Sequence, residues 1–198
     1  MESNQKIKLA VFASGGGSNA REICKYFKGN ERIEIALILS NKSNAGVREV
    51  AVMFDITFVA FNKKDLYDTS YVKDRLKAHQ VDYIILAGFL WLIPEYLITL
   101  YPHKIINIHP SLLPKYGGVG MYGHHIHEAV KANAELASGI TIHLVNENYD
   151  DGKYLFQKSI TLDPAWNAHS IASEVLKIEH LYYSRIIHKL INNSVEAE

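Results

Sequence analysis

Two adjoining segments set the architecture of this chain: the apolar run Ile7-Lys8-Leu9-Ala10-Val11-Phe12-Ala13 and the turn Ser14-Gly15-Gly16-Gly17-Ser18-Asn19. A short apolar run that ends in glycines is typical of a β-strand followed by a tight turn. Asn19 and Glu22 are three residues apart, which predicts a capping box at the start of a helix. The opening therefore predicts a strand, a turn and a helix.

Strand-like and helix-like segments continue to alternate beyond this opening. Further strands are predicted at 33–39, 56–60, 83–87 and 105–108, with helices at 47–54 and 65–79. The last two of these strands are almost wholly apolar, as strands buried on both faces of a parallel sheet are. After Ser138 the pattern changes, and the remaining elements predicted are strands at 139–145 and 154–160 and one long helix at 166–190.

This order predicts an α/β fold with a doubly wound, mostly parallel, Rossmann-like sheet. The two strands after Ser138 are expected to form an antiparallel pair, and the long helix closes the chain. The 198 residues show no internal repeat or linker, so we expect a single domain spanning 1–198.

Composition narrows the classes of partner. Lys+Arg and Asp+Glu both number 21, and this neutral balance disfavours binding to nucleic acid or to a membrane surface. The longest uncharged apolar stretch, Tyr83 to Pro94, is shorter than the roughly 18 residues of a membrane helix. A polar start without a signal peptide and the single Cys24 predict a cytoplasmic protein. Small molecules are the expected ligands, and a monomer or a weak homodimer would fit.

In a doubly wound sheet, ligands bind beyond the carboxyl ends of the strands. The glycine-rich turn at 14–19 follows the first strand, and its backbone N–H groups can hold an anion at the start of the next helix. It is neither a Walker loop nor a dinucleotide fingerprint. The alternative is a tight turn that needs glycine only for its backbone geometry.

A second segment, Asn107-Ile108-His109-Pro110-Ser111-Leu112-Leu113-Pro114, follows a buried strand. Residues two apart on an extended chain point to the same side, so Asn107 and His109 are expected to lie together. An amide donor beside an imidazole suits acyl transfer, because one group stabilises an oxyanion and the other moves a proton. The alternative is a structural histidine in a rigid turn.

The acidic loop Asn146-Glu147-Asn148-Tyr149-Asp150-Asp151-Gly152 joins the last two strands. Asp-Gly is common in hairpin turns. The functional alternative places one aspartate beside His109, where it would favour the imidazolium form. The sequence leaves both alternatives open.

Together, the segments resemble those of the phosphoribosylglycinamide formyltransferase family, folate-dependent enzymes of purine synthesis, over nearly the whole chain. The matching segments are Ser14–Asn19, Ser40–Lys42, Leu86–Phe89, Asn107–Lys115, Ser138–His143, Asp150 with Gly152, and Glu179-His180. The Asn-x-His-Pro-Ser-Leu-Leu-Pro segment is highly specific for enzymes that use 10-formyltetrahydrofolate.

This resemblance implies that the chain transfers a formyl group from 10-formyltetrahydrofolate to the amine of N1-(5-phospho-D-ribosyl)glycinamide, without a metal. It implies that protonated His109 stabilises the oxyanion and assists proton transfer to N10, that Asn107 binds the same oxyanion, and that Asp150 orients His109 through ordered water. His143 matches a supporting histidine behind the site.

The resemblance also assigns the two binding sites. It places the ribonucleotide on Gly17, Ser18, Asn19, Ala20 and Glu179. It places the folate on Lys64, Leu90, Trp91, Leu92, Ile93, Asn107, Asn146, Glu147, Asn148, Tyr149 and Asp150. The chain departs from the family at Trp91, where members often carry arginine, and at Leu176, where some carry lysine. The glycine-rich segment 117–123 is interpreted as a mobile lid over the folate, or else as a surface loop.

Related activities fit less well. A formyltetrahydrofolate hydrolase normally carries a preceding regulatory domain, an initiator-tRNA formyltransferase carries an RNA-binding domain, and sugar N-formyltransferases are usually longer. A non-catalytic folate-binding module would not need Asn107, His109 and Asp150 together. His124, His125 and His127 lack cysteine partners, so we interpret them as a solvent-exposed cluster rather than a zinc site. Cys24 is expected to be inert.

Overall fold

The structure, a computed structural model, describes residues 5–195, which group into two compact units. The boundary lies between Ile106 and Asn107, inside one β-strand. Among the described residues, no helix has both the length and the apolar character that a membrane crossing requires.

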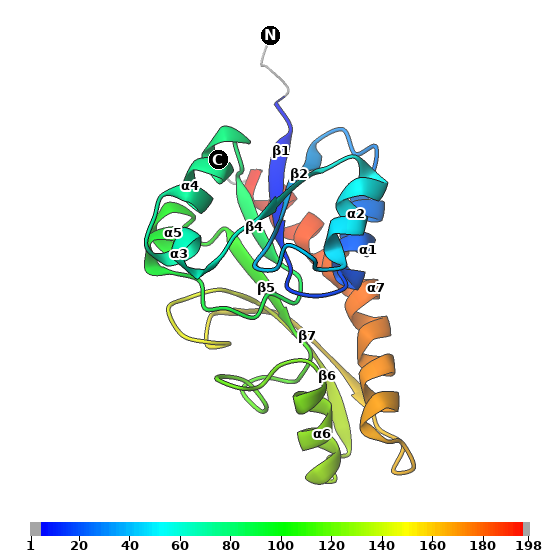
Figure 1. Ribbon diagram of the computed structural model, residues 1–198. Coiled ribbons are helices and arrows are strands. Elements are labelled where there is room, and N and C mark those ends of the chain that lie inside the picture. The colour runs from blue at the N-terminus through cyan, green and yellow to red at the C-terminus, as the bar shows by residue number, and fades with distance from the viewer. Residues whose placement is uncertain (1–4, 196–198) are drawn as a thin grey trace. The chain divides into compact units, whose positions relative to one another are not determined.

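The first unit alternates strands and helices as predicted (Figure 1). Its elements are β1 (Ile7–Phe12), α1 (Ser18–Phe27), β2 (Ile33–Ser40), α2 (Val47–Phe54), β3 (Thr57–Ala60), α3 (Lys63–Tyr67), α4 (Tyr71–Ala78), β4 (Tyr83–Leu86) and α5 (Glu95–Leu100). β1 pairs in parallel with both β2 and β4, and β2 pairs in parallel with β3. Because the chain winds outward from β1 in both directions, this is the doubly wound arrangement.

The apolar strands form the core of this unit. β4 is buried along its whole length, and Leu9 to Ala13 have no exposed surface. α1 and α2 lie on one side of the strands, and α3, α4 and α5 lie on the other (Figure 1). The sheet is therefore covered on both faces, which explains why its strands lack polar alternation.

Two local expectations in the first unit are wrong. The helix expected at 65–79 is two helices, α3 and α4, separated by residues 68–70. α3 begins at Lys63, earlier than expected, because a capping box starts it: the Asn62 side chain accepts from Asp65 N at 3.0 Å and the Asp65 carboxylate accepts from Asn62 N at 2.9 Å. The capping box expected for Asn19 and Glu22 is absent, because α1 starts directly after Gly17 and without a side-chain cap. α5 was not predicted.

The second unit contains β5 (Ile105–His109), which runs through the boundary, α6 (His124–Ala132), β6 (Ala137–Leu144), β7 (Tyr154–Thr161) and α7 (Ala168–Val195). β6 and β7 are antiparallel, as expected, and α7 packs on both and on α6 (Figure 1). α7 begins at Ala168 rather than at 166. Tyr183 on α7 is buried in the core of the second unit, whereas Trp166 and Tyr182 are half-buried.

The strand order is β3-β2-β1-β4-β5-β6-β7 in one seven-stranded sheet. The mostly parallel sheet with a C-terminal antiparallel pair and a long helix is thus confirmed.

Candidate active site

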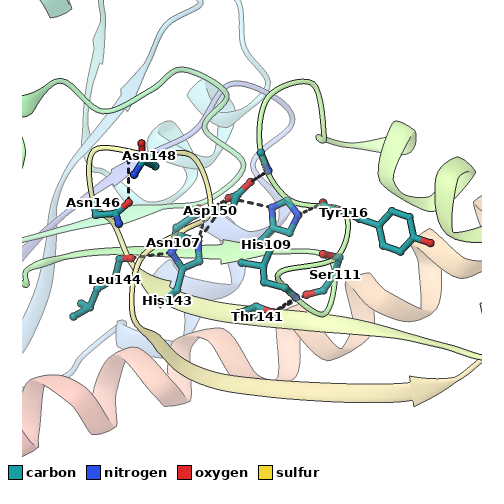
Figure 2. Close-up of polar contacts among 12 residues, drawn as sticks. Asn107, His109, Ser111, Tyr116, Thr141, His143, Leu144, Asn146, Asn148 and Asp150 are labelled. Carbon is teal, nitrogen blue, oxygen red and sulfur yellow. Dashed lines mark hydrogen bonds and ion pairs between the residues drawn. The ribbon is translucent and has the colours of Figure 1, made fainter.

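Asn107 and His109 lie two residues apart at the carboxyl end of β5. The alternation of the strand directs both side chains the same way, as the sequence predicted (Figure 2). His109 is 4% exposed, and Asn107 is half-buried. An amide and an imidazole are therefore held together in a place that water reaches poorly.

His143 on β6 fixes the position of the Asn107 amide. Its ring Nδ1 lies 2.8 Å from the Leu144 carbonyl oxygen, which can only accept, so Nδ1 carries the hydrogen. Nε2 of a neutral ring is then an acceptor, and it lies 3.1 Å from the Asn107 Nδ2 donor. His143 thus orients the amide that the sequence singled out.

Asp150 lies beside both histidines (Figure 2). Its Oδ1 is 3.3 Å from His109 Nδ1, 3.7 Å from His143 Nε2 and 3.5 Å from Asn107 Nδ2. Its Oδ2 accepts a hydrogen bond from Gly118 N at 3.0 Å. The acidic loop therefore brings a carboxylate next to His109.

The charge of Asp150 is stabilised by these neighbours. Burial alone would raise the pKa of this carboxyl group, but the hydrogen bond from His109, the positive charge of His109 and the Gly118 N–H lower it further than burial raises it. The net result is a pKa below the ordinary value of aspartate, so the group is a carboxylate at neutral pH.

The second nitrogen of His109 also faces an acceptor. Nε2 lies 2.7 Å from the carbonyl oxygen of Tyr116. With a carboxylate at Nδ1 and a carbonyl at Nε2, only a ring protonated on both nitrogens donates to both neighbours. Both ring nitrogens of His109 therefore face acceptors, and the two contacts orient the ring.

Sequence reasoning missed Tyr116, because its contribution is a backbone carbonyl. Its side chain fixes that carbonyl: the hydroxyl donates to Glu135 Oε1 at 2.9 Å and accepts from Asn133 Nδ2 at 2.9 Å. Tyr116 has φ 58°, which a bulky residue adopts only when its surroundings hold it. These contacts keep the carbonyl aimed at His109.

The loop after β5 is fastened to the antiparallel strands. The Thr141 hydroxyl donates to Ser111 O at 2.7 Å and accepts from Leu113 N at 3.0 Å. Gln157 Nε2 on β7 donates to Leu113 O and to Thr141 Oγ1, both at 2.9 Å. This latch, made by Thr141 and Gln157, holds the proline-rich segment in place, and no pattern in the sequence indicated it.

The glycine-rich turn forms the start of α1 in the first unit. Gly17 has φ 75°, and a Cβ there would lie 2.7 Å from Val47 Cγ2, so glycine is required at this position. Gly15 and Gly16 are exposed, have no positive φ and would meet nothing within 4 Å, which leaves room for a ligand beside the helix start. The geometric need for glycine is met at Gly17, and the binding of an anion by the turn stays a prediction.

The segment after β4 carries the predicted folate contacts. Leu90 is exposed, Trp91 and Leu92 are half-buried, and Ile93 is buried. Trp91 contacts the rings of Phe61, Tyr67 and Phe89, with centroids 6.1 to 6.5 Å apart. Lys63 Nζ lies 5.9 Å from the centre of the Trp91 ring, a contact that the sequence did not indicate. Lys64, the predicted basic residue near the folate, is exposed on α3.

The remaining predicted residues lie in the second unit. Asn146 and Asn148 both donate to Asp151 Oδ2 at 3.3 Å, so the acidic loop is held by its own amides. Glu147 and Tyr149 are exposed. Glu179 is buried on α7, and its charge, together with the larger effect of burial, raises the pKa of Tyr183.

Comparison with known proteins identifies the family. A family model described as formyl transferase matches residues 7–187. The chain belongs to the formyl transferase family.

Relatives of this formyltransferase chain have more specific names. It is 37% identical to a phosphoribosylglycinamide formyltransferase of Bacillus subtilis over 96% of this chain and 98% of that protein. It is 39% identical to the chloroplastic enzyme of that name in Arabidopsis thaliana over 92% of this chain. The chain spans 65% of that plant protein and 63% of the one in Vigna unguiculata.

Solved structures show the same fold. The crystal structure of glycinamide ribonucleotide transformylase 1 from Geobacillus kaustophilus superposes with a TM-score of 0.85 at 30% identity, over 94% of this chain and 99% of that one. A phosphoribosylglycinamide formyltransferase from Bacillus halodurans gives 0.84 at 30% identity, over 94% and 96%. The resemblance seen in the sequence is confirmed.

One expectation about the histidines of this chain is wrong. His124 and His125 are exposed, but His127 is buried on α6 and does not belong to a solvent cluster. Burial, and next to it the charge of His109, lower the pKa of His127 to about 4, so its ring is neutral at pH 7. Cys24 is buried, which raises its pKa to about 12 and fits an inert thiol.

Proposed function

We propose that the chain transfers the formyl group of 10-formyltetrahydrofolate to the amine of N1-(5-phospho-D-ribosyl)glycinamide in purine biosynthesis. The observation that carries this proposal is the His109 ring, held between the Asp150 carboxylate and the Tyr116 carbonyl with the Asn107 amide at its side. The names of the relatives supply the acceptor and the formyl group, and the family resemblance supplies 10-formyltetrahydrofolate as the donor.

In this reaction the amine nitrogen attacks the formyl carbon, and the carbonyl π electrons move to oxygen. The resulting oxyanion needs donors, and the two weakly held ones are His109 Nδ1–H, 3.3 Å from Asp150, and one Asn107 N–H, at 3.5 Å from the same oxygen. The Asn107 N–H can turn from Asp150 Oδ1 to the oxyanion, and the His109 Nδ1–H can be shared between Asp150 Oδ1 and the oxyanion, while Nε2–H stays on the Tyr116 carbonyl and keeps the ring oriented.

Collapse of the oxyanion breaks the bond from carbon to N10. The leaving N10 takes a proton from the imidazolium, and the neutral imidazole left behind takes the proton that the attacking amine loses, so the products are the formamide and tetrahydrofolate. Asp150 keeps the imidazolium charged until that transfer. His143, bonded to the Asn107 amide, acts as a positioning residue.

The binding roles follow the family resemblance. The first turn of α1, with Gly17, Ser18, Asn19 and Ala20, is proposed to hold the substrate phosphate on its N–H groups, which suits the positive end of a helix. Glu179 is proposed to hold the ribose hydroxyls.

The folate is assigned to the exposed surface of the segment after β4 and to the acidic loop. The proposed contacts are Leu90, Trp91, Leu92, Ile93, Asn107, Asn146, Glu147, Asn148, Tyr149 and Asp150, with Lys64 near its carboxylates. Trp91, which stands where members often carry arginine, offers an aromatic face and the nearby Lys63 instead of a guanidinium. We keep the segment at 117–123 as a proposed lid.

We also propose that the chain acts as a single formyltransferase domain in the cytoplasm, as a monomer or weak homodimer, and that the reaction needs no metal. The single cysteine supports a reducing compartment.

The test mixes the purified chain with 10-formyltetrahydrofolate and the glycinamide ribonucleotide, and follows the absorbance of the deformylated folate and the mass of the formylated product. Product that needs both substrates and survives a chelator supports the proposal. Deformylation without the amine would indicate a hydrolase, and folate binding without turnover would indicate a binding module. Formylation of an amino sugar alone would indicate a sugar N-formyltransferase.

A further inference from the structure

Three exposed side chains gather at the start of α6, outside the centre just described. They belong to His124, His125 and Glu128, and one ligand atom from each lies within 4.8 Å of the other two. Among residues 5–195, no other group of three histidine, cysteine or acidic side chains has its ligand atoms this close together. Two imidazoles and a carboxylate at such a spacing form a chelating surface.

The helix explains why these side chains converge. Glu128 lies four residues after His124 and three after His125, so it is a neighbour of both on the helix surface. His125 Nδ1 is already 3.7 Å from Glu128 Oε2, and the two imidazole rings are 4.1 Å apart. The edge of the Tyr122 ring packs against His125 at 5.2 Å. The three ligands are thus gathered without any ion.

The donor set selects one class of ion. Imidazole suits zinc, copper and nickel, whereas magnesium and calcium prefer sites made wholly of oxygen. Two histidines and one glutamate, with water completing the coordination, are a known zinc ligand set. Ligand atoms on a tetrahedral zinc lie about 3.4 Å apart at the usual bond lengths of roughly 2.1 Å. Small side-chain rotations would bring atoms that are now within 4.8 Å to that separation.

Glu128 supplies the further ligand that the sequence interpretation of these histidines did not consider, and we propose, against that interpretation, that His124, His125 and Glu128 bind one divalent transition-metal ion, of the class of zinc, on the surface of α6. The site does not include His127, whose side chain is only 5% exposed. It uses none of the residues assigned to formyl transfer, so it stands or falls independently of the proposed function. The ion is bound outside the reaction centre, and the proposed reaction does not use it.

Titration of the chelator-treated chain with Zn²⁺ in a calorimeter tests this site, and Co²⁺ absorption reports its coordination. We expect one site, weakened at least about tenfold in His124→Ala, His125→Ala or Glu128→Gln, since even outer-shell partners of a metal contribute tenfold or more. The matched control is His169→Ala, another exposed histidine in the first turn of a helix, which should leave the affinity unchanged.

The three substitutions are on exposed side chains, and circular dichroism shows whether each variant remains folded. Equal Zn²⁺ affinity in the native chain and in the triple variant would overturn the proposal, as would Mg²⁺ binding as tightly as Zn²⁺. A loss of affinity in His169→Ala equal to that in the site variants would also overturn it.

Discussion

Asp150→Asn removes one negative charge 3.3 Å from His109 while keeping the shape of the side chain. Opposite unit charges at this separation attract by about 5 kcal/mol at an effective dielectric constant of ~20. The Asp150 side chain is 10% exposed, so water recovers part of this attraction in the variant. We expect a net cost of about 3–4 kcal/mol in the activation free energy, or roughly a 10²- to 10³-fold fall in kcat.

The assay is the absorbance of the deformylated folate at saturating concentrations of both substrates, with folate affinity measured separately by equilibrium binding. Asp163→Asn is the control, because Asp163 also accepts a backbone N–H, from Ala165 at 2.8 Å, but contacts none of the proposed site. Its kcat should stay close to that of the native chain. If Asp150→Asn lowered folate affinity as much as kcat, or changed kcat by less than about threefold, the charge-pairing role of Asp150 would be wrong.

Three further outcomes follow from buried groups. The pKa of His127 is about 4 in the folded chain and about 6.5 in the unfolded chain, so between these pH values only the unfolded chain binds the extra proton. The free energy of unfolding should therefore fall by up to about 3 kcal/mol as the pH drops from 6.5 to 4. Urea titrations of His127→Leu should lack this dependence of stability on pH. Gly152→Ala should lower the free energy of unfolding by about 2 kcal/mol or more, because the added Cβ would collide with the Leu144 carbonyl. Gly15→Ala is the control: its added Cβ would have no atom within contact distance, so the free energy of unfolding should change by less than about 0.5 kcal/mol. Cys24, with its pKa at about 12, should resist iodoacetamide at pH 8 until denaturant unfolds the chain, and rapid native alkylation would contradict its burial.

Much of the fold could be predicted because apolar runs mark buried strands directly. The strands at 33–39 and 105–108 were placed within one residue of β2 and β5. Helix ends were less predictable, because they depend on which polar side chain the backbone selects as a cap. Asn62 caps α3, although Asn19 showed the same pattern.

The side-chain members of the site were predictable, but their backbone partners were not. Strand alternation was enough to pair Asn107 with His109. The sequence could not decide whether Asp150 reached His109, because that contact depends on how the whole acidic loop folds. The Tyr116 carbonyl and the Gly118 N–H leave no mark in the residue types, since every residue carries such groups.

The contacts of Gln157 have a consequence for mutational tolerance. This glutamine lies on the last strand of the sheet and is exposed, so a selection experiment would normally find it free to vary. Its amide nevertheless donates to Leu113 and Thr141, which hold the loop that follows His109. In a library of β7 variants, Lys158 and Ser159 should therefore accept many replacements, while position 157 should be as restricted as an interior residue.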